Sequence, residues 1–365
     1  MNPMKLSLLV VAFVVLPVAV GTWRGFARAR GRRRGAPVDR NPGPDGSYRL
    51  IGWALRHMPG WFNRAGMDIG TSIAWATLPR QRGYSREYLR LALGHEPTVR
   101  EVWTHIRTYT EYLILRLGIC EGEEPKVRFA EGHGDELRAC LAEGRAILYG
   151  TMHVGHSDLL GFLLGNLGGR AHMVRKKVGN SDDIDRLASR YAGSVSFIWI
   201  NDWSRLILAM NDALRSGCSL AMQCDRFEYS SKRAGFDFFG RRLLFPFTIY
   251  HLAIMHGLPV ALSYAVSAEG EPESIVVHMA PMFRPRPGHE HREENFAAAH
   301  AHFQGFLALI EAQLRRTPYL WFNFTPMNPP CSNDPPASRG RTRLGATSAG
   351  PVATNTAKWT SVVSR

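Results

Sequence analysis

The sequence is poor in cysteine and lacks the spacings that bind structural zinc. Its 365 residues include five cysteines, which are scattered and form no C-x-x-C pair. An odd number of cysteines without close spacing argues against a disulfide framework and against a zinc ribbon. Reduced, buried thiols of the kind found in the cytosol are the simpler interpretation.

Acidic residues are outnumbered by basic ones, and the net charge is +14. The excess is concentrated near the two ends. Residues 24–34 hold six arginines, residues 331–365 carry a net +4, and the rest of the chain carries the remaining +4. The six arginines are Arg24, Arg28, Arg30, Arg32, Arg33 and Arg34. Such a distribution suits anionic lipid headgroups better than a groove that follows nucleic-acid phosphates, so we expect no nucleic-acid partner.

A long apolar run opens the chain at residues 6–20, where Ser7 is the one polar residue. About twenty residues are needed to span a bilayer, and residues up to Trp23 can extend the run to the interface. The arginine cluster that follows resists translocation, so we predict a retained membrane anchor at residues 1–23 with the remainder of the chain in the cytoplasm. A cleaved signal peptide and an interfacial helix are the alternatives.

The rest of the chain divides by composition into four segments. A basic flank and a linker rich in Pro and Gly cover residues 24–47, and a helical lead-in covers 48–125. Residues 126–328 alternate short apolar runs with helical patterns, which predicts an α/β fold with a central mixed sheet and flanking helices. The tail at 329–365 has little to bury and is predicted to be disordered.

Within the α/β part, apolar periodicity predicts individual strands and helices. The predicted strands are 146–151, 171–177, 195–200, 218–225 and 258–267, and the predicted helices are 157–169, 181–193, 203–217, 245–257 and 295–318.

The stretch "GTMHVGHSDLLG" ends one predicted strand and opens a helix. If His153 ends the strand, Ser157 caps the helix and Asp158 lies in its first turn, where its carboxylate can fold back towards the imidazole. A carboxylate that holds Nδ1–H leaves Nε2 as a base. Open α/β sheets place their sites beyond the carboxyl ends of strands, which is where this motif falls. His156 is predicted to be a helix-start or rim residue rather than a catalyst.

The chain contains no G-x-S-x-G nucleophile elbow. The predicted base would therefore deprotonate a hydroxyl on the substrate, which then attacks an activated acyl group. Arg175 and Lys176, at the end of the following strand, could stabilise the developing oxyanion.

The form H-x4-D resembles the signature of the glycerolipid and lysophospholipid acyltransferases. The wider layout resembles the branch that contains the bacterial lipid A biosynthesis acyltransferases (lauroyl and myristoyl transferases). The resemblance covers roughly residues 48–326. It rests on the blocks "EGRAILYGTMHVGHSDLLG", "MVRKK", "LRSGCSLAMQCDR", "FDFFGRRLLFPFTIYHLAIMHGLPV" and "RRTPYLWFNF".

The resemblance implies a general base at His153 with Asp158 as its orienting partner. Arg175 matches a basic position that contacts a phosphate or the acyl carbonyl. It also implies transfer of a fatty acyl group from an acyl carrier protein or coenzyme A thioester to a hydroxyl of a lipid-like acceptor. No metal or redox cofactor is expected, the partners are membrane lipids and the acyl donor, and the location is the inner (cytoplasmic) membrane.

Four further substrate-binding positions follow from the same resemblance. Asp225 aligns with an acidic position after a later strand, and Arg226 stands where the family usually has Gln. Phe239 and Gly240 match the "FFG" element, near which the acceptor or the acyl chain is expected.

Two other classes of function remain open. The spacing H-x-x-H-x-D offers nitrogen and oxygen ligands, so a metal-dependent hydrolase is one alternative. A non-catalytic lipid-binding protein that keeps the fold is the other.

Overall fold

The computed structural model describes residues 47–120, 122–176, 182–201, 203–227, 230 and 232–327. The predicted anchor at 1–23, nearly all of the basic flank and the tail at 329–365 lie outside these residues. Among the helices that are described, none combines the length and the apolar character needed to cross a membrane. The anchor therefore stays a prediction.

In the described chain, four helices precede the sheet and form the helical part of the molecule. They are α2 (Ser47–His57), α3 (Gly60–Thr77), α4 (Pro79–Leu93) and α5 (Val99–Cys120). Their limits follow from local chemistry: Pro79 occupies the first position of α4, and Gly94 ends it in the left-handed conformation. Thr98 and Glu101 form a reciprocal capping box at the start of α5.

Seven strands of the described chain form the central mixed sheet, in the order β1-β9-β8-β2-β5-β3-β4. They are β1 (Lys126–Phe129), β2 (Leu148–Thr151), β3 (Ala171–Arg175), β4 (Val195–Trp199), β5 (Ser219–Gln223), β8 (Val260–Ala268) and β9 (Glu271–Met279). Only β8 and β9 pair antiparallel within this sheet. The prediction of an α/β fold with a mixed central sheet and flanking helices is confirmed.

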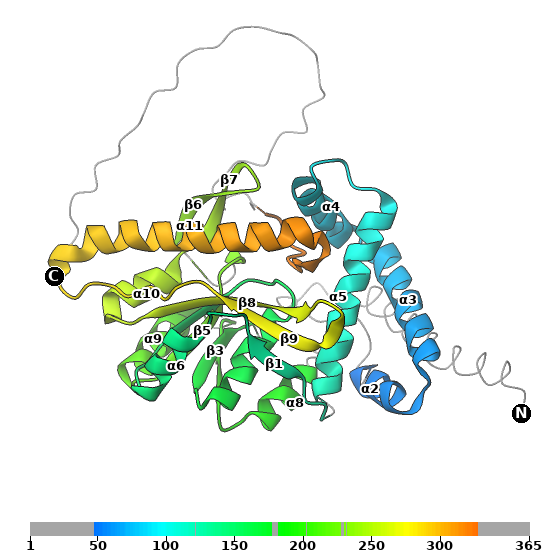
Figure 1. Cartoon of the computed structure of the whole chain (residues 1–365), viewed down its shortest axis with the longest axis horizontal. Coiled ribbons are helices and arrows are strands. Elements are labelled where there is room, and N and C mark those ends of the chain that lie inside the picture. The colour runs from blue at the N-terminus through cyan, green and yellow to red at the C-terminus, as the bar shows by residue number, and fades with distance from the viewer. Residues whose placement is uncertain are drawn as a thin grey trace, which may run out of the picture. The chain divides into compact units, whose positions relative to one another are not determined.

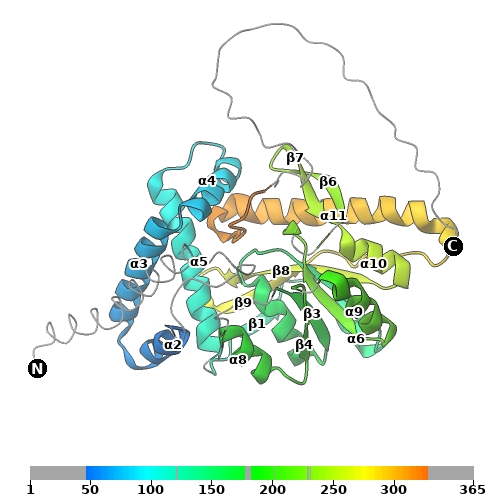
Figure 2. The same cartoon turned by 180° about the vertical axis from the view of Figure 1, so that it is seen from behind.

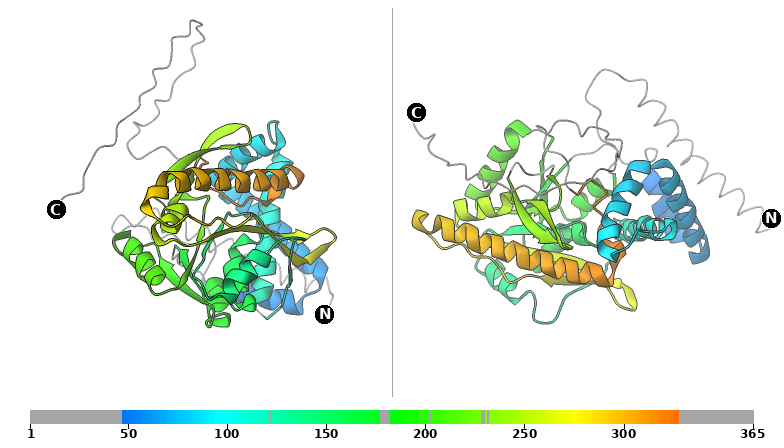
Figure 3. Two further views of the ribbon diagram at one scale, coloured as in Figure 1. Left: turned by 60° about the vertical axis from the view of Figure 1, so that its left-hand side comes forward. Right: turned by 90° about the horizontal axis from the view of Figure 1, so that it is seen from above.

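Helices cover both faces of the sheet, and the alternation of side chains along each strand divides the core in two. In β2, Leu148 belongs to a cluster shared with α9, α10 and α11, whereas the flanking Ile147 and Tyr149 contact the cluster of α6 and α8. These helices are α6 (Asp135–Ala142), α8 (Asp182–Arg190), α9 (Trp203–Arg215), α10 (Thr248–His256) and α11 (Arg292–Arg316). Figure 3 shows α4 and α5, coloured light blue to cyan, beside the orange C-terminal end of α11.

A separate hairpin of β6 (Arg233–Phe238) and β7 (Arg241–Pro246) stands next to α11. Figures 1 and 2, which view the molecule from opposite sides, both show it apart from the central sheet. Its two-residue turn has Phe239 at φ 51° and Gly240 at φ 70°. Positive φ at both central residues is the geometry that matches the twist of a hairpin.

The prediction of one continuous helix over 157–169 is wrong. The segment is divided into the 3₁₀ turn η1 (Ser157–Leu159), the single helical turn α7 (Leu160–Leu163) and the 3₁₀ turn η2 (Leu164–Leu167). Its glycines explain the interruption, because glycine is a poor helix former. Gly161 leaves room for Met173, which comes within 2.8 Å of where a Cβ atom would stand.

The predicted helix over 245–257 begins too early, since Phe245 and Pro246 end strand β7 and α10 starts at Thr248. The strands β1, β6, β7 and β9 and the helix α6 lie outside the predicted elements. β1 has four residues, and Gly235 and Gly240 interrupt the apolar pattern of the hairpin, so periodicity gives little signal there.

Candidate active site

The candidate site lies where two neighbouring parallel strands end. β2 and β5 pair in parallel, with Thr151 opposite Gln223. His153 and Asp225 each stand two residues beyond these paired positions. The backbone N–H of Cys224 still donates to the carbonyl of Thr151 at 2.7 Å, so the two chains stay together past the strand ends. The sheet therefore brings an imidazole and a carboxylate, 72 residues apart in sequence, to one point.

His153 and Asp225 make two contacts. His153 Nδ1 lies 2.7 Å from Asp225 Oδ1, and the backbone N–H of His153 donates to Oδ2 at 2.9 Å. A carboxylate is an acceptor, so this contact places the ring proton on Nδ1 and the lone pair of the neutral ring on Nε2. The Asp225 side chain is completely buried, whereas the His153 side chain keeps 14% of its surface exposed. This is the arrangement of a base held by a buried carboxylate.

The surroundings of Asp225 keep it ionised although it is buried. Burial by itself raises the pKa of Asp225, but the charges of His153 and Arg226 and the hydrogen bonds from His153 and Trp321 outweigh it and hold the pKa below its ordinary value. Trp321 Nε1–H donates to Oδ2 at 2.8 Å. Arg226 donates to the carbonyl of Phe322 and to Asn323 Oδ1, at 3.1 and 3.2 Å.

The loop after β2 is fixed by two other segments. The carbonyl of His153 accepts from Phe322 N–H at 2.7 Å, and the N–H of Gly155 donates to the carbonyl of Leu320 at 2.9 Å. On its other side, Gly155 approaches β8 so closely that a Cβ atom would stand 2.2 Å from the carbonyl oxygen of Ala265. Gly155 also has φ +55°, a conformation natural to glycine. The backbone around His153 is therefore held between β8 and the C-terminal segment.

His156 is buried and packed against neighbouring side chains. It is 2% exposed, its ring stacks on Tyr112 with centroids 4.0 Å apart, and its Nε2 lies 3.0 Å from Ser267 Oγ. His156 is the residue that precedes the 3₁₀ turn η1 (Ser157–Leu159), so it stands at a helix start as predicted, and it is buried. That it is not a catalyst stays a prediction. His153 Nδ1 and His156 Nε2 are thus engaged with different partners.

No group of three or more His, Cys, Asp or Glu side chains among the described residues is arranged to hold a metal ion. The metal-dependent hydrolase stays an alternative, because the side chain of Asp158, its third proposed ligand, lies outside the described part of the structure.

Asp158 lies in η1, directly after the loop that carries His153. Its side chain is outside the described part of the structure, so its predicted pairing with His153 stays a prediction. Nδ1 carries a single proton, which it donates in the hydrogen bond to Asp225. A carboxylate of Asp158 that acts on the imidazole would therefore have to act from the Nε2 side.

A cavity of about 800 Å³ opens beside the strand ends, where Thr151 and Gln223 line it and His153 does not. Leu160, Leu164, Met173 and Val277 are among its lining residues, and Arg175 stands at the end of β3 in its wall. A cavity of this size that combines apolar side chains with polar and charged ones, such as Arg128 and Gln223, is typical of small-molecule sites. Arg175 is therefore placed at the cavity, as a substrate contact requires, on the side of the sheet that carries the α6 and α8 cluster.

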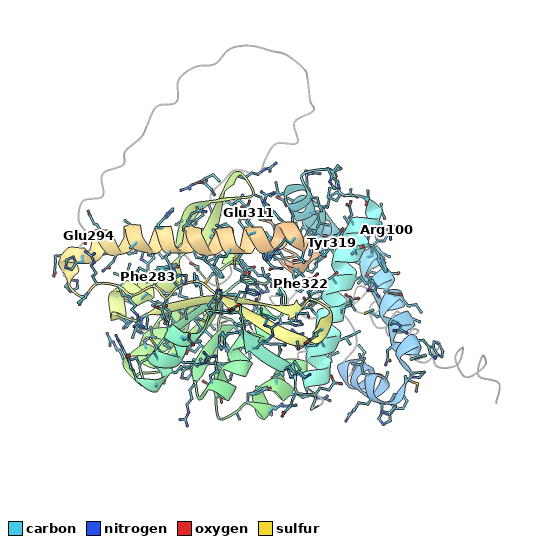
Figure 4. The ribbon with its side chains drawn as sticks, in the orientation of Figure 1. Arg100, Phe283, Glu294, Glu311, Tyr319 and Phe322 are labelled. Atoms are coloured by element: carbon cyan, nitrogen blue, oxygen red, sulfur yellow. The ribbon has the colours of Figure 1, made fainter. Side chains whose placement is uncertain are left out.

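Phe239 and Gly240 form the turn of the β6–β7 hairpin and do not line the cavity. Phe239 is 7% exposed, its backbone N–H donates to Glu311 at 2.7 Å, and the guanidinium of Arg315 lies 5.2 Å from its ring centroid. Figure 4 labels Glu311 on α11 next to this hairpin. These contacts give Phe239 a packing role, and the predicted contact of both residues with substrate stays a prediction.

Two residues of the site were not singled out from the sequence. Trp321 and Asn323 both contact Asp225, the indole N–H at its carboxylate and the amide at its backbone carbonyl, 3.4 Å away. Both belong to the short block "RRTPYLWFNF", in which no periodicity or spacing marks them. Only the position of this block against β2 and β5 shows their role.

Neither the scan against protein-family models nor the search among curated proteins gives a match for this chain.

Proposed function

We propose that the chain is an acyltransferase in which His153 is the general base and Asp225 holds it in the active tautomer. The observation that carries the proposal is the contact of His153 Nδ1 with the buried Asp225 at the carboxyl ends of β2 and β5. The cavity beside the same strand ends supports an acyl substrate, because Leu160, Leu164 and Met173 in its wall offer a site for a hydrocarbon chain.

The reaction balances without a cofactor. His153 Nε2 takes the proton of an acceptor hydroxyl as its oxygen attacks the carbonyl carbon of an acyl thioester. A carbon–oxygen bond forms, the carbon–sulfur bond breaks, and the thiol leaves with the proton held by the imidazolium. Asp225 stabilises the imidazolium between these steps. Arg175, in the cavity wall, would stabilise negative charge on the donor or on the carbonyl oxygen.

The helical part supports a place at the membrane surface. Trp53 in α2 and Trp61 in α3 are 44% and 56% exposed, and these helices directly follow the basic flank. Exposed tryptophans are favoured at membrane interfaces, where one part of the ring is apolar and the N–H is wet. This arrangement agrees with a retained anchor at 1–23 and a lipid-like acceptor.

The test compares lipids from cells that express the wild-type chain, His153→Gln or His172→Gln. His172 is a matched control because it lies in β3 and bonds to Ser196 Oγ, away from Asp225. We expect acylated lipids that appear with the wild type and with His172→Gln and are reduced about 100-fold or more with His153→Gln. Mass spectrometry of lipid extracts measures them. Equal lipids in the wild type and in His153→Gln would refute the mechanism.

A further inference from the structure

Trp321 is a buried residue that completes the carboxylate site of Asp225. It follows the 3₁₀ turn η5 (Pro318–Leu320), pairs with Val154 in an antiparallel bridge, and is 2% exposed. Its indole N–H donates to Asp225 Oδ2 at 2.8 Å. Together with the two N–H groups of His153, it gives the carboxylate three protein donors.

The backbone of Trp321 is bound to the helical part. His105 Nε2 lies 2.9 Å from the carbonyl of Trp321, and His105 Nδ1 lies 2.8 Å from Ser85 Oγ. A carbonyl only accepts, so Nε2 carries the proton and Nδ1 accepts from the Ser85 hydroxyl. Burial lowers the pKa of His105 to about 4, which keeps the ring neutral at physiological pH. Ser85 is in α4 and His105 in α5, and both are 1% exposed.

Aromatic packing fixes the indole in place. Tyr88 and Phe238 meet it edge to face, with ring centroids at 5.0 and 5.4 Å. The hydroxyl of Tyr88 donates to the carbonyl of Pro318 at 2.7 Å, so the same α4 residue holds both the ring and the turn before it. Figure 4 shows Tyr319 and Phe322, which flank this stretch, beside α5. Indole rings with their N–H bonded and both edges packed have little freedom to rotate.

We propose that Trp321 is a positioning residue for acyl transfer: its indole N–H fixes Asp225 against His153, and the buried relay Ser85–His105–Trp321 ties that contact to helices α4 and α5. Its catalytic consequence rests on the proposed function, whereas the relay itself does not. A donor that stabilises the Asp225 carboxylate also weakens that carboxylate as an acceptor for His153. Trp321 therefore sets the basicity of His153.

The groups that face this contact set the electrostatic background. Besides His153 and Asp225 they are Arg226, which follows Asp225, the neutral rings of His105 and Tyr88, and the buried thiol of Cys224. Burial raises the pKa values of Tyr88 and Cys224, so neither carries charge near neutral pH. Arg226 stays cationic throughout the range in which a histidine titrates.

The test measures the pKa of His153 by NMR of ring-labelled histidine in the full chain, with the signal assigned by its loss in His153→Gln. In Trp321→Phe the carboxylate lacks one donor, so it becomes a stronger acceptor and favours the imidazolium. We expect the pKa of His153 to rise by on the order of half a unit to one unit.

Trp75→Phe is the matched control. It removes an indole N–H that has no hydrogen-bond partner in the described chain, from α3 and not from the site. The pKa of His153 should stay unchanged in this variant. An unchanged or lowered pKa in Trp321→Phe, or an equal rise in Trp75→Phe, would overturn the proposal.

A second measurement avoids any tryptophan substitution in case Trp321→Phe does not fold. Indole ¹H–¹⁵N signals of the protein with its native tryptophans are followed against pH. One signal should move with the titration of His153 and lose this movement in His153→Gln. The absence of any indole signal that follows His153 contradicts the proposed role of the Trp321 indole at Asp225.

Activity separates this proposal from the proposed function. If acyl transfer is present, the pH at which its rate is half-maximal on the acidic side should rise in Trp321→Phe together with the pKa of His153. A shifted pKa of His153 in a chain without acyl transfer would support the role of the Trp321 indole and reject the function. Acyl transfer together with an unshifted pKa of His153 in Trp321→Phe would support the proposed function and reject the role of the Trp321 indole.

Discussion

At the residue scale, one carboxylate organises the site. Asp225 receives the ring N–H and the backbone N–H of His153 and the indole N–H of Trp321. All its partners are donors, and the charge of Arg226 stands next to it, so the ionised form is favoured despite full burial. A substitution that removes the charge of Asp225 and keeps the shape of its side chain isolates this electrostatic role.

Asp225→Asn makes that change. An amide at this position presents a donor or a weaker acceptor to His153 Nδ1, so the tautomer with the lone pair on Nε2 loses its support. We expect acyl transfer to fall about 10²- to 10⁴-fold. The rate of thiol release from an acyl thioester in the presence of lipid acceptor measures it.

Asp158→Asn is the informative companion. Full activity in Asp225→Asn together with inactivity in Asp158→Asn would mean that Asp158, as the resemblance implies, orients the base. Thermal unfolding of both variants distinguishes a loss of chemistry from a loss of folding.

At the element scale, the loop after β2 depends on a close approach that only glycine permits. Gly155 has a positive φ, and its Cα faces the backbone of β8, which cannot move aside without breaking the sheet. Gly240, in the turn between β6 and β7, also has a positive φ, but a Cβ atom there would meet nothing within 4 Å. A substitution at Gly240 therefore introduces conformational strain alone, whereas a substitution at Gly155 introduces the same strain together with a steric clash.

Gly240→Ala should lower the free energy of unfolding by about 1–2 kcal/mol, the cost of the left-handed conformation for a residue with a Cβ atom. Gly155→Ala adds a clash at 2.2 Å with the carbonyl of Ala265 to the same strain. We expect Gly155→Ala to lower the free energy of unfolding by at least about 3 kcal/mol and to disturb the geometry of the site. Urea unfolding compares the two, and equal losses would show that β8 yields at Ala265.

At the scale of the whole molecule, the C-terminal segment connects parts that are distant in sequence. Residues 318–323 contact the helical part through Tyr88 and His105 and the strand ends through Asp225 and His153. The residue at the centre of this junction, His105, is buried and neutral. Its protonation should therefore act on the stability of the fold and not only on the site.

Acidification should destabilise the protein through His105. The folded chain keeps His105 neutral down to its pKa of about 4, whereas the unfolded chain takes up the proton near 6.5. The unfolded state binds more protons in this window, so stability is lost as the pH falls from about 6.5 to about 4. Urea unfolding at pH 7 and pH 5 measures the loss.

His105→Gln is the matched variant, because an amide can donate to the carbonyl of Trp321 and accept from Ser85. Between pH 7 and pH 5 the wild type should lose about 2 kcal/mol more of its free energy of unfolding than this variant does. Other buried histidines, such as His302, titrate equally in both proteins. The same loss in both would show that His105 is not the group responsible.

Much of this arrangement is readable along the chain. Apolar periodicity predicts the helices before the sheet and most of the α/β alternation, because each side chain reports whether its own position is buried. The loop of His153 at a strand end follows from the same pattern. Residues 157–169 are one exception, where Gly161, which packs against Met173, and the glycines after it interrupt a pattern that predicts one helix.

The sequence by itself determined the class of fold, the strand-end position of His153 and the helix-start position of His156, since these depend on residues close in sequence. Only the tertiary structure decided the partner of Nδ1. The order in which strands lie in a sheet depends on crossovers and not on local pattern, and it is the placement of β5 beside β2 that brings Asp225 to His153. The tertiary structure also decided the contact of Trp321 with Asp225, which forms because the segment after α11 folds back over the strand ends.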